Sequence, residues 1–263
     1  MLNSQEKHLS SNGKTGNATD PSTPTLDENI LTVTSMNDIP NFGNEQYKGG
    51  LQENALPKEV ISDILSLSPE QKSPLIGKPV SIDPKTGRVD FPQAFRDALS
   101  SETLEYIDSF SQKFNAIGDW SAQFLIQSHL GTRQKAESFH PDSWCADVER
   151  QIRAFSSISD TPEGQQHETE LLMTDGLDLK EVQNTFQHKG SYDTLPEPYN
   201  NRILPIKSGD MVFIKGLGDG KHSILRDAFI HRAPPHKNSY PEEGKQRDTL
   251  IWQRQISLEQ DFG

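Results

Sequence analysis

Two side chains in one short segment have the types and spacing to hold a metal ion together. His140 and Asp142 lie two positions apart, on either side of Pro141. In an extended segment the side chains at positions i and i+2 project to the same face, so this imidazole and this carboxylate can reach one ion. Two histidines and one carboxylate on one side of a divalent metal leave other coordination positions open. The segment therefore predicts part of an open metal site.

The pair has little weight by itself. The sequence has 8 histidines and 38 acidic residues in 263 positions, so about one His-x-acid pair is expected from composition alone. The pair at 140 and 142 is the one that the chain contains. The metal hypothesis therefore depends on what the rest of the sequence offers.

Three later segments offer residues of matching chemistry. The segment Ile203–Ile214 has the pattern of a strand, a Gly-Asp turn and a second strand. In Phe229–Pro234 an apolar pair precedes His231, and further on Arg247 and Thr249 lie two positions apart at the head of a predicted strand. The planar guanidinium group of arginine is suited to bind a carboxylate through two parallel hydrogen bonds.

In this order the segments resemble the Fe(II)- and 2-oxoglutarate-dependent oxygenase superfamily. Its motifs are His-x-Asp, a Gly-Asp turn, a distal histidine and Arg-x-Ser. The chain is most similar to a poorly characterised bacterial branch with Phe-His-x-Asp, a Gly-Asp strand ending in Lys-Gly, and His-Arg-x-Pro. Those motifs are Phe139–Asp142, Gly209–Gly216 and His231–Pro234 here. The resemblance covers about residues 120–255.

The resemblance implies a double-stranded β-helix with His140, Asp142 and His231 as the iron ligands. Arg247 would bind the distal carboxylate of the cosubstrate 2-oxoglutarate, with Thr249 in place of the usual serine. The implied cofactor is Fe(II). The implied reaction uses dioxygen to hydroxylate or otherwise oxidise a C–H bond of a small molecule, so the chain would be an Fe(II)/2-oxoglutarate-dependent dioxygenase.

Two other functions remain open. The spacing of 16 positions between His231 and Arg247 is long for this family, which leaves a non-catalytic or degenerate β-helix module that acts as a sensor or binding protein. A metal-dependent isomerase or hydrolase of the cupin type is the other alternative. It requires a further histidine near the ion, for which His222 and His236 are the candidates.

Several other residues have a structural interpretation. Trp252 and Phe213 are expected in the core rather than in a site. Arg153 alternates with apolar neighbours and is expected to face the interior of the barrel. There it needs an anionic partner, which would be the substrate or an acid such as Glu170.

Apolar spacing predicts three helices in the first half of the chain. Proline followed by apolar residues at helical intervals indicates a helix from Pro57 to Leu65. A short second helix is expected over Phe91–Leu99, and the clearest helix covers Ser101–Ile117. Ser100 or Ser101 is its expected N-cap, and Gly118 its expected stop.

After Gly118 the period changes toward two, which predicts strands. A helix inserted between strands is expected at Asp178–Phe186. Helices followed by short strands indicate an α+β fold with a jelly-roll core and the N-terminal helices packed on it. The predicted strands are Phe124–Ser128, Ile152–Ser157, Leu171–Met173, Ile203–Pro205, Met211–Phe213 and Leu250–Arg254.

The same patterns divide the chain into three parts. Residues 1–50 are rich in Ser, Asn, Thr, Gly, Asp and Pro, a composition that buries little apolar surface. They are predicted to form a flexible arm with a short strand at Ile30–Val33; an arm docked on the core is the alternative. Residues 51–118 are the helical part and 119–263 the oxygenase-like part, and 51–263 are expected to form one compact domain.

Composition excludes several functional classes. The net charge of −12 argues against nucleic-acid binding, because the binding of phosphate backbones requires positive charge. No apolar run approaches the length of a membrane span, so neither a membrane nor a nucleic acid is an expected partner. A single cysteine and an N-terminus without a secretory pattern predict a cytoplasmic protein. The sequence indicates no oligomeric state.

Overall fold

A computed structural model describes the helices and strands of the protein and many of their side chains. The described residues are 30–43, 47, 49–117, 122–130, 140–141, 148–159, 169–174, 177–178, 181, 197, 199–217, 230–232 and 246–257. Nearly all of the helix predicted at Asp178–Phe186 lies outside these residues.

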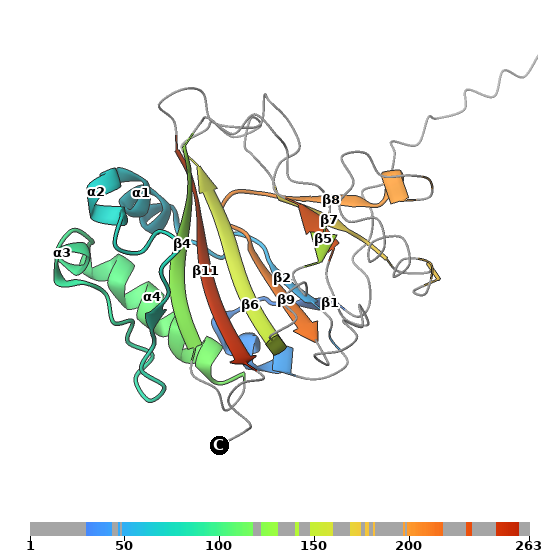
Figure 1. Ribbon diagram of the computed structural model, residues 1–263, viewed down its shortest axis with the longest axis horizontal. Coiled ribbons are helices and arrows are strands. Elements are labelled where there is room, and N and C mark those ends of the chain that lie inside the picture. The colour runs from blue at the N-terminus through green and yellow to red at the C-terminus, as the bar shows by residue number, and fades with distance from the viewer. Residues whose placement is uncertain are drawn as a thin grey trace, which may run out of the picture.

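The strands form two sheets (Figure 1). The larger sheet has seven strands in the order β1-β2-β9-β6-β11-β4-β3, and the smaller has four in the order β5-β10-β7-β8. Apart from the parallel pair β1–β2, the described pairs are antiparallel. The strands are β1 Ile30–Thr32, β2 Gly49–Gln52, β3 Val80–Ser81, β4 Ala122–Leu130, β5 His140–Pro141, β6 Val148–Ser159, β7 Thr169–Leu172, β8 Ile203–Ile206, β9 Met211–Leu217, β10 Ile230–Arg232 and β11 Gln246–Ser257.

The order of the last eight strands defines a double-stranded β-helix. Along the chain, β4, β6, β9 and β11 belong to the large sheet, while β5, β7, β8 and β10 belong to the small one. The chain therefore crosses repeatedly between two facing four-stranded layers, β9-β6-β11-β4 and β5-β10-β7-β8, which is the jelly-roll arrangement. The predicted α+β fold with a β-helix core is confirmed.

Helices cover the outer face of the large sheet (Figure 1). The four α-helices are α1 Lys58–Ser66, α2 Pro69–Lys72, α3 Gln93–Arg96 and α4 Ser101–Asn115, and the 3-10 helices are η1 Met36–Gly43 and η2 Tyr199–Asn201. Ser100 caps α4, because its side chain accepts a hydrogen bond from the Thr103 backbone N–H at 3.2 Å. The predicted helices at Pro57–Leu65 and Ser101–Ile117 are confirmed, whereas the helix expected at Phe91–Leu99 is limited to one turn.

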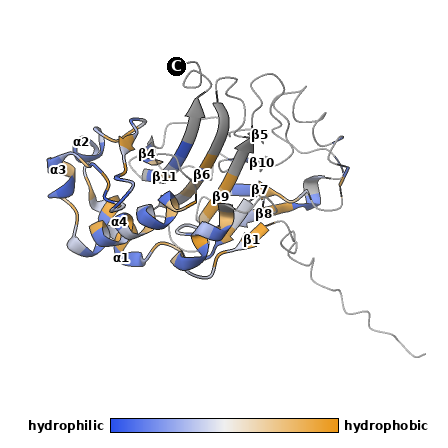
Figure 2. Ribbon diagram, turned by 90° about the horizontal axis from the view of Figure 1, so that it is seen from below, coloured by the Kyte–Doolittle hydropathy of each residue, from blue (hydrophilic) through white to orange (hydrophobic). Residues whose placement is uncertain are grey.

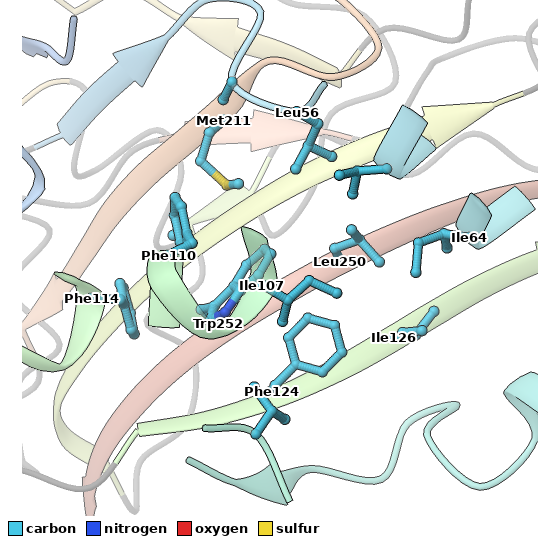
Figure 3. Packing of buried hydrophobic residues seen from close by; sticks show 14 of the residues in the cluster. Leu56, Ile64, Ile107, Phe110, Phe114, Phe124, Ile126, Met211, Leu250 and Trp252 are labelled. Atoms are coloured by element: carbon cyan, nitrogen blue, oxygen red, sulfur yellow. The ribbon is translucent and has the colours of Figure 1, made fainter. Parts of the chain in front are cut away.

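Aromatic side chains hold the helices to the sheet (Figure 3). The indole ring of Trp252 lies 4.5 Å from the Phe110 ring and 4.9 Å from the Phe124 ring, measured between centroids. Its Nε1 donates a hydrogen bond to Ser111 Oγ on α4 at 2.8 Å. Trp252 and Phe213 are both fully buried in this cluster. Their predicted place in the core is confirmed.

Strand alternation separates this outer core from a second core between the two sheets. On β11, Leu250 and Trp252 pack toward the helices, while Ile251 joins the second core. The second core also includes Phe155 from β6 and Leu171 from the small sheet. Figure 2 shows hydrophobic residues along β6 and β9 and hydrophilic residues on α3. Among the described residues of β4, β6, β9 and β11, successive apolar side chains therefore point alternately to the helices and to the space between the two sheets.

The segment after Ile30 belongs to the fold rather than to a free arm. β1 pairs with β2 at the edge of the large sheet, which confirms the predicted short strand. Ile39 and Phe42 from η1 are fully buried, and the Phe42 ring lies 5.6 Å from the Phe213 ring. The prediction of a flexible arm as far as residue 50 is therefore wrong for this part. Its apolar residues are few, but most of them are buried, as in the docked alternative: Ile30, Val33, Ile39 and Phe42 are buried, and Leu31 and Met36 are partly buried.

The predicted Gly-Asp turn joins β8 to β9. Gly209 has a φ of 89°, a conformation that favours glycine, and a Cβ atom there would lie 2.9 Å from Ile61 Cδ1. Asp210 accepts hydrogen bonds from the Asn54 backbone N–H at 2.7 Å and from the Lys207 backbone N–H at 3.1 Å. Burial raises the pKa of the Asp210 carboxyl, although these hydrogen bonds oppose the rise. The motif thus has a structural role in which a buried carboxyl holds two loops together.

A buried ion pair joins α2 to β11. Lys72 Nζ lies 2.7 Å from Asp248 Oδ2, and neither side chain is exposed to solvent. The attraction between two buried charges offsets the free energy lost by removing them from water only while both charges are present. Asp248 lies between Arg247 and Thr249, so this contact ties the helical layer to the part of β11 that carries the candidate cosubstrate residues.

We expect Lys72→Met to lower the free energy of unfolding by roughly 3–5 kcal/mol, because it leaves the Asp248 carboxylate buried without its ammonium partner. The double variant Lys72→Met/Asp248→Leu removes both charges and is expected to recover most of that loss. Urea unfolding followed by circular dichroism measures both values. A loss below about 1 kcal/mol in the single variant would contradict the expectation that Asp248 depends on Lys72 for its stability in the interior.

Candidate functional site between the two sheets

Arg247 lies inside the β-helix among hydroxyl groups from three strands. Its side chain is buried, and Nη2 donates hydrogen bonds to Ser157 Oγ at 2.8 Å and to Thr169 Oγ1 at 3.2 Å. Ser157 Oγ lies 3.2 Å from Thr249 Oγ1 and 3.3 Å from Thr169 Oγ1. Ser157, Thr169, Arg247 and Thr249, here called the arginine cluster, span both sheets, because Thr169 is on β7.

The strand register explains how the arginine cluster forms. Thr249 on β11 is the direct cross-strand partner of Ser157 on β6. Arg247 and Thr249 are two positions apart and therefore share the inward face of β11. Arginine keeps its positive charge at any pH relevant to proteins, and these hydroxyls are neutral. The arrangement can therefore hold a carboxylate inside the β-helix, where water screens charge poorly.

His231 lies near this cluster on the small sheet. It is buried, with its ring centroid 5.6 Å from that of Phe155 on β6. Its backbone pairs with Leu171 on β7 and, on the other side, with His140 on β5. The structure describes the backbone of His140, and directly opposed positions of antiparallel strands belong to one face of a sheet. Two of the three predicted metal ligands thus occupy paired positions.

Two strands independently place His231 one step away from the arginine cluster. On β6, Ser157 belongs to the cluster and Phe155, two residues earlier, contacts His231. On β7, Thr169 belongs to the cluster and Leu171, two residues later, pairs with His231. A two-residue step along a strand is roughly 7 Å. His231 and the arginine cluster therefore occupy neighbouring inward positions along both strands.

The third predicted ligand, Asp142, lies outside the described residues. Among the residues that the structure describes, no group of three or more His, Cys, Asp or Glu side chains could hold a metal ion. The histidines of the cupin alternative, His222 and His236, also lie outside the described part of the chain. The described half of the candidate centre therefore consists of His231, the position of His140 and the arginine cluster.

An ion pair next to His231 corrects one prediction. The anionic partner expected for Arg153 is the substrate or an acid such as Glu170, but Glu170 Oε2 lies 2.5 Å from Nε of Arg232 instead. Glu170 and Arg232 are direct cross-strand partners on β7 and β10. Their positions alternate with those of Leu171 and His231, so the pair lies on the other face of the small sheet. It stabilises the register that places His231 inward.

Sequence reasoning missed two members of the arginine cluster. Ser157 ends the predicted strand Ile152–Ser157, and alternation places it on the same face as Arg153, but the strand pattern does not show which residue lies opposite it in the sheet. Thr169 had no such signal, because it comes from the facing sheet. Only a prediction of which strands face each other would have found it.

Comparisons with solved structures return distant likenesses. A prolyl-4-hydroxylase from Pseudomonas putida is 11% identical, with a TM-score of 0.43, over 85% of this chain and 93% of that one. The dioxygenase for auxin oxidation 1 from Arabidopsis thaliana, in a complex with 2-oxoglutarate, is 10% identical, with a TM-score of 0.43, over 88% and 93%. HygX from Streptomyces hygroscopicus, with nickel and 2-oxoglutarate bound, is 9% identical, with a TM-score of 0.40, over 79% and 82%.

No protein-family model and no curated protein sequence matches the chain. The assignment of the fold therefore rests on the strand order of the two sheets. The chain is a double-stranded β-helix protein, and its ordered motifs resemble those of the Fe(II)- and 2-oxoglutarate-dependent oxygenases. In the described part of the chain, no helix is long and apolar enough to cross a membrane.

Proposed function

We propose that the protein is a non-haem Fe(II)- and 2-oxoglutarate-dependent oxygenase that oxidises a C–H bond of a small molecule with dioxygen. One observation carries the proposal: the buried arginine cluster lies a single two-residue step from His231, which is paired with His140. The ordered motifs of the sequence support it.

The chemistry of the residues fits these groups. Neutral imidazoles at positions 140 and 231 and the carboxylate of Asp142 would hold Fe(II) and leave open positions, as in other two-histidine, one-carboxylate sites. Arg247 would bind the distal carboxylate of 2-oxoglutarate. When bound, the iron and the keto acid would together supply the activation of dioxygen that C–H oxidation needs.

The described residues would contribute orientation and shielding. The hydrogen bonds from Arg247 Nη2 to Ser157 and Thr169 fix the plane of the guanidinium group, which then directs one end of the diacid. Thr249 is expected to donate to the same carboxylate through its hydroxyl group. Phe155 and Ile251 are buried in the core between the two sheets and would shield the bound keto acid from water.

The direct test is an anaerobic titration of purified protein with Fe(II) and 2-oxoglutarate. We expect a weak visible charge-transfer band that appears only when both are present. On admission of air, 2-oxoglutarate should be converted to succinate. A folded protein that gives neither the band nor succinate would contradict the proposal and favour a binding or sensor module. Metal binding without any effect of 2-oxoglutarate would favour the cupin alternative.

A further inference from the structure

A second polar row crosses the inward face of the large sheet. Gln123 on β4, Gln253 on β11 and Arg153 on β6 are direct partners across adjacent strands. Arg153 Nη2 donates to Gln253 Oε1 at 3.5 Å, and Gln253 Nε2 donates to Gln123 Oε1 at 3.4 Å. Residues two apart on a strand share a face, so this row lies on the same side of the sheet as Phe155 and Ile251.

The row lies beyond His231, on the side away from the arginine cluster. Ser157, Phe155 and Arg153 are successive inward residues of β6. Ser157 binds Arg247, and Phe155 packs against the ring of His231. Arg153 lies two residues before Phe155 on β6, a step of roughly 7 Å, and four residues before Ser157, a distance of roughly 13 Å along the strand. Viewed along β6, the candidate metal ligand His231 therefore lies between Arg247, which binds Ser157, and Arg153.

The second row is more open than the arginine cluster. Gln253 is buried, whereas Arg153 and Gln123 are half-buried. The two amide contacts in the row exceed the usual 2.7–3.2 Å range of N–H···O hydrogen bonds, so they are weak. A ligand that offers a charged acceptor at this place would form shorter and stronger hydrogen bonds.

We infer that Arg153, Gln253 and Gln123 form the site that recognises the substrate, and that the substrate is a small carboxylic acid. The inference rests on the proposed function, in which 2-oxoglutarate occupies Arg247 and one side of the metal. The substrate then lies on the remaining side, with its carboxylate on Arg153 and the carbon to be oxidised beside His231.

The composition of the row favours a carboxylate over a phosphate. One guanidinium group matches the single charge and planar geometry of a carboxylate. The two glutamines add neutral amide groups, and their N–H groups can donate hydrogen bonds to the oxygen lone pairs of the carboxylate that Arg153 leaves open. The net charge of −12 does not oppose this choice, because contacts inside the β-helix act at shorter range than the surface charges, which salt screens within about 8–10 Å.

The experiment uses the full chain loaded anaerobically with Fe(II) and saturating 2-oxoglutarate. The probes are the protein amino acids and their primary amides, which differ only in the carboxylate. Calorimetric titration gives each dissociation constant, and the shift of the charge-transfer band reports binding next to the metal. We expect the best acid to bind at least tenfold more tightly than its amide, which is about 1.4 kcal/mol.

Two variants test whether the row causes this preference. Arg153→Gln should raise the dissociation constant of the best acid at least tenfold, so that the acid no longer binds more tightly than its amide. The affinity for 2-oxoglutarate should change less than twofold. Gln253→Glu places an internal carboxylate beside Arg153. This carboxylate should compete with the acid for the guanidinium group and raise the dissociation constant of the acid as well. Arg88→Gln, at an exposed arginine on the helical side, is the matched control and should change neither affinity.

The outcomes separate this inference from the proposed function. A charge-transfer band with no acid preferred over its amide, or with the preference intact in folded Arg153→Gln, overturns the inference alone. Absence of 2-oxoglutarate binding overturns the proposed function. In that case the acid–amide comparison is repeated with the unloaded protein, where a preference that depends on Arg153 still supports a carboxylate site and its absence overturns that as well.

Discussion

Replacement of Arg247 by glutamine is expected to raise the KM for 2-oxoglutarate roughly 100-fold or more. The guanidinium group would form a charged, bidentate contact with the distal carboxylate, and each charge-assisted hydrogen bond contributes roughly 1.5–3 kcal/mol. Glutamine retains an N–H donor but has neither the positive charge nor the two parallel N–H groups of arginine. Succinate release at increasing 2-oxoglutarate concentration measures the change.

Three variants control this result. Thr249→Ala removes one hydrogen bond from a neutral hydroxyl to the carboxylate and should raise the same KM by roughly tenfold, since a hydrogen bond to a charged group contributes at least about 1.5 kcal/mol. Arg247→Lys keeps the charge without the fork and should fall between Arg247→Gln and the unmodified protein. Arg88→Gln should match the unmodified protein. If Arg247→Gln left the KM for 2-oxoglutarate unchanged, Arg247 would not be the residue that binds the cosubstrate. If neither the variant nor the unmodified protein bound 2-oxoglutarate or released succinate, the chain would be a degenerate β-helix module rather than an oxygenase.

Replacement of His231 by glutamine should reduce Fe(II) affinity at least 100-fold and abolish succinate formation. The physical reason is that the variant would lose one of the three proposed protein ligands, and even a residue that only supports a ligand commonly contributes a factor of 10–100. Metal content after equilibrium dialysis against Fe(II) measures the effect under anaerobic conditions, independently of turnover.

The control for this variant is His188→Ala, at a histidine with no acidic residue at ligand spacing. It should retain full metal content. Circular dichroism and the thermal midpoint must show that His231→Gln is folded, because the imidazole also packs on Phe155. A folded His231→Gln protein with unchanged iron affinity would remove His231 from the metal site. The pairing of His231 with His140 would then be purely structural.

Local patterns predicted much of this fold. The spacing of apolar residues and the serine before α4 were sufficient for that helix, because both act within a few residues of the chain. Alternation also predicted that Arg153 on β6 faces the interior, and Phe155, which shares its face, lies in the core between the two sheets. The extent of the N-terminal arm was wrong, because its polar composition concealed a few apolar residues that are buried by distant parts of the sheet.

For the candidate site, the sequence by itself determined the residue types and their order: His140, Asp142, His231, Arg247 and Thr249. Tertiary structure alone decided their neighbours. Thr169 reaches Arg247 from the facing sheet, and Glu170 pairs with Arg232 instead of Arg153. The reason is that strand periodicity sets which face a side chain occupies, whereas its partners depend on which strands pair and which sheets face each other. Those pairings join distant positions, such as Ser157 and Arg247, which are 90 residues apart, and Lys72 and Asp248, which are 176 residues apart.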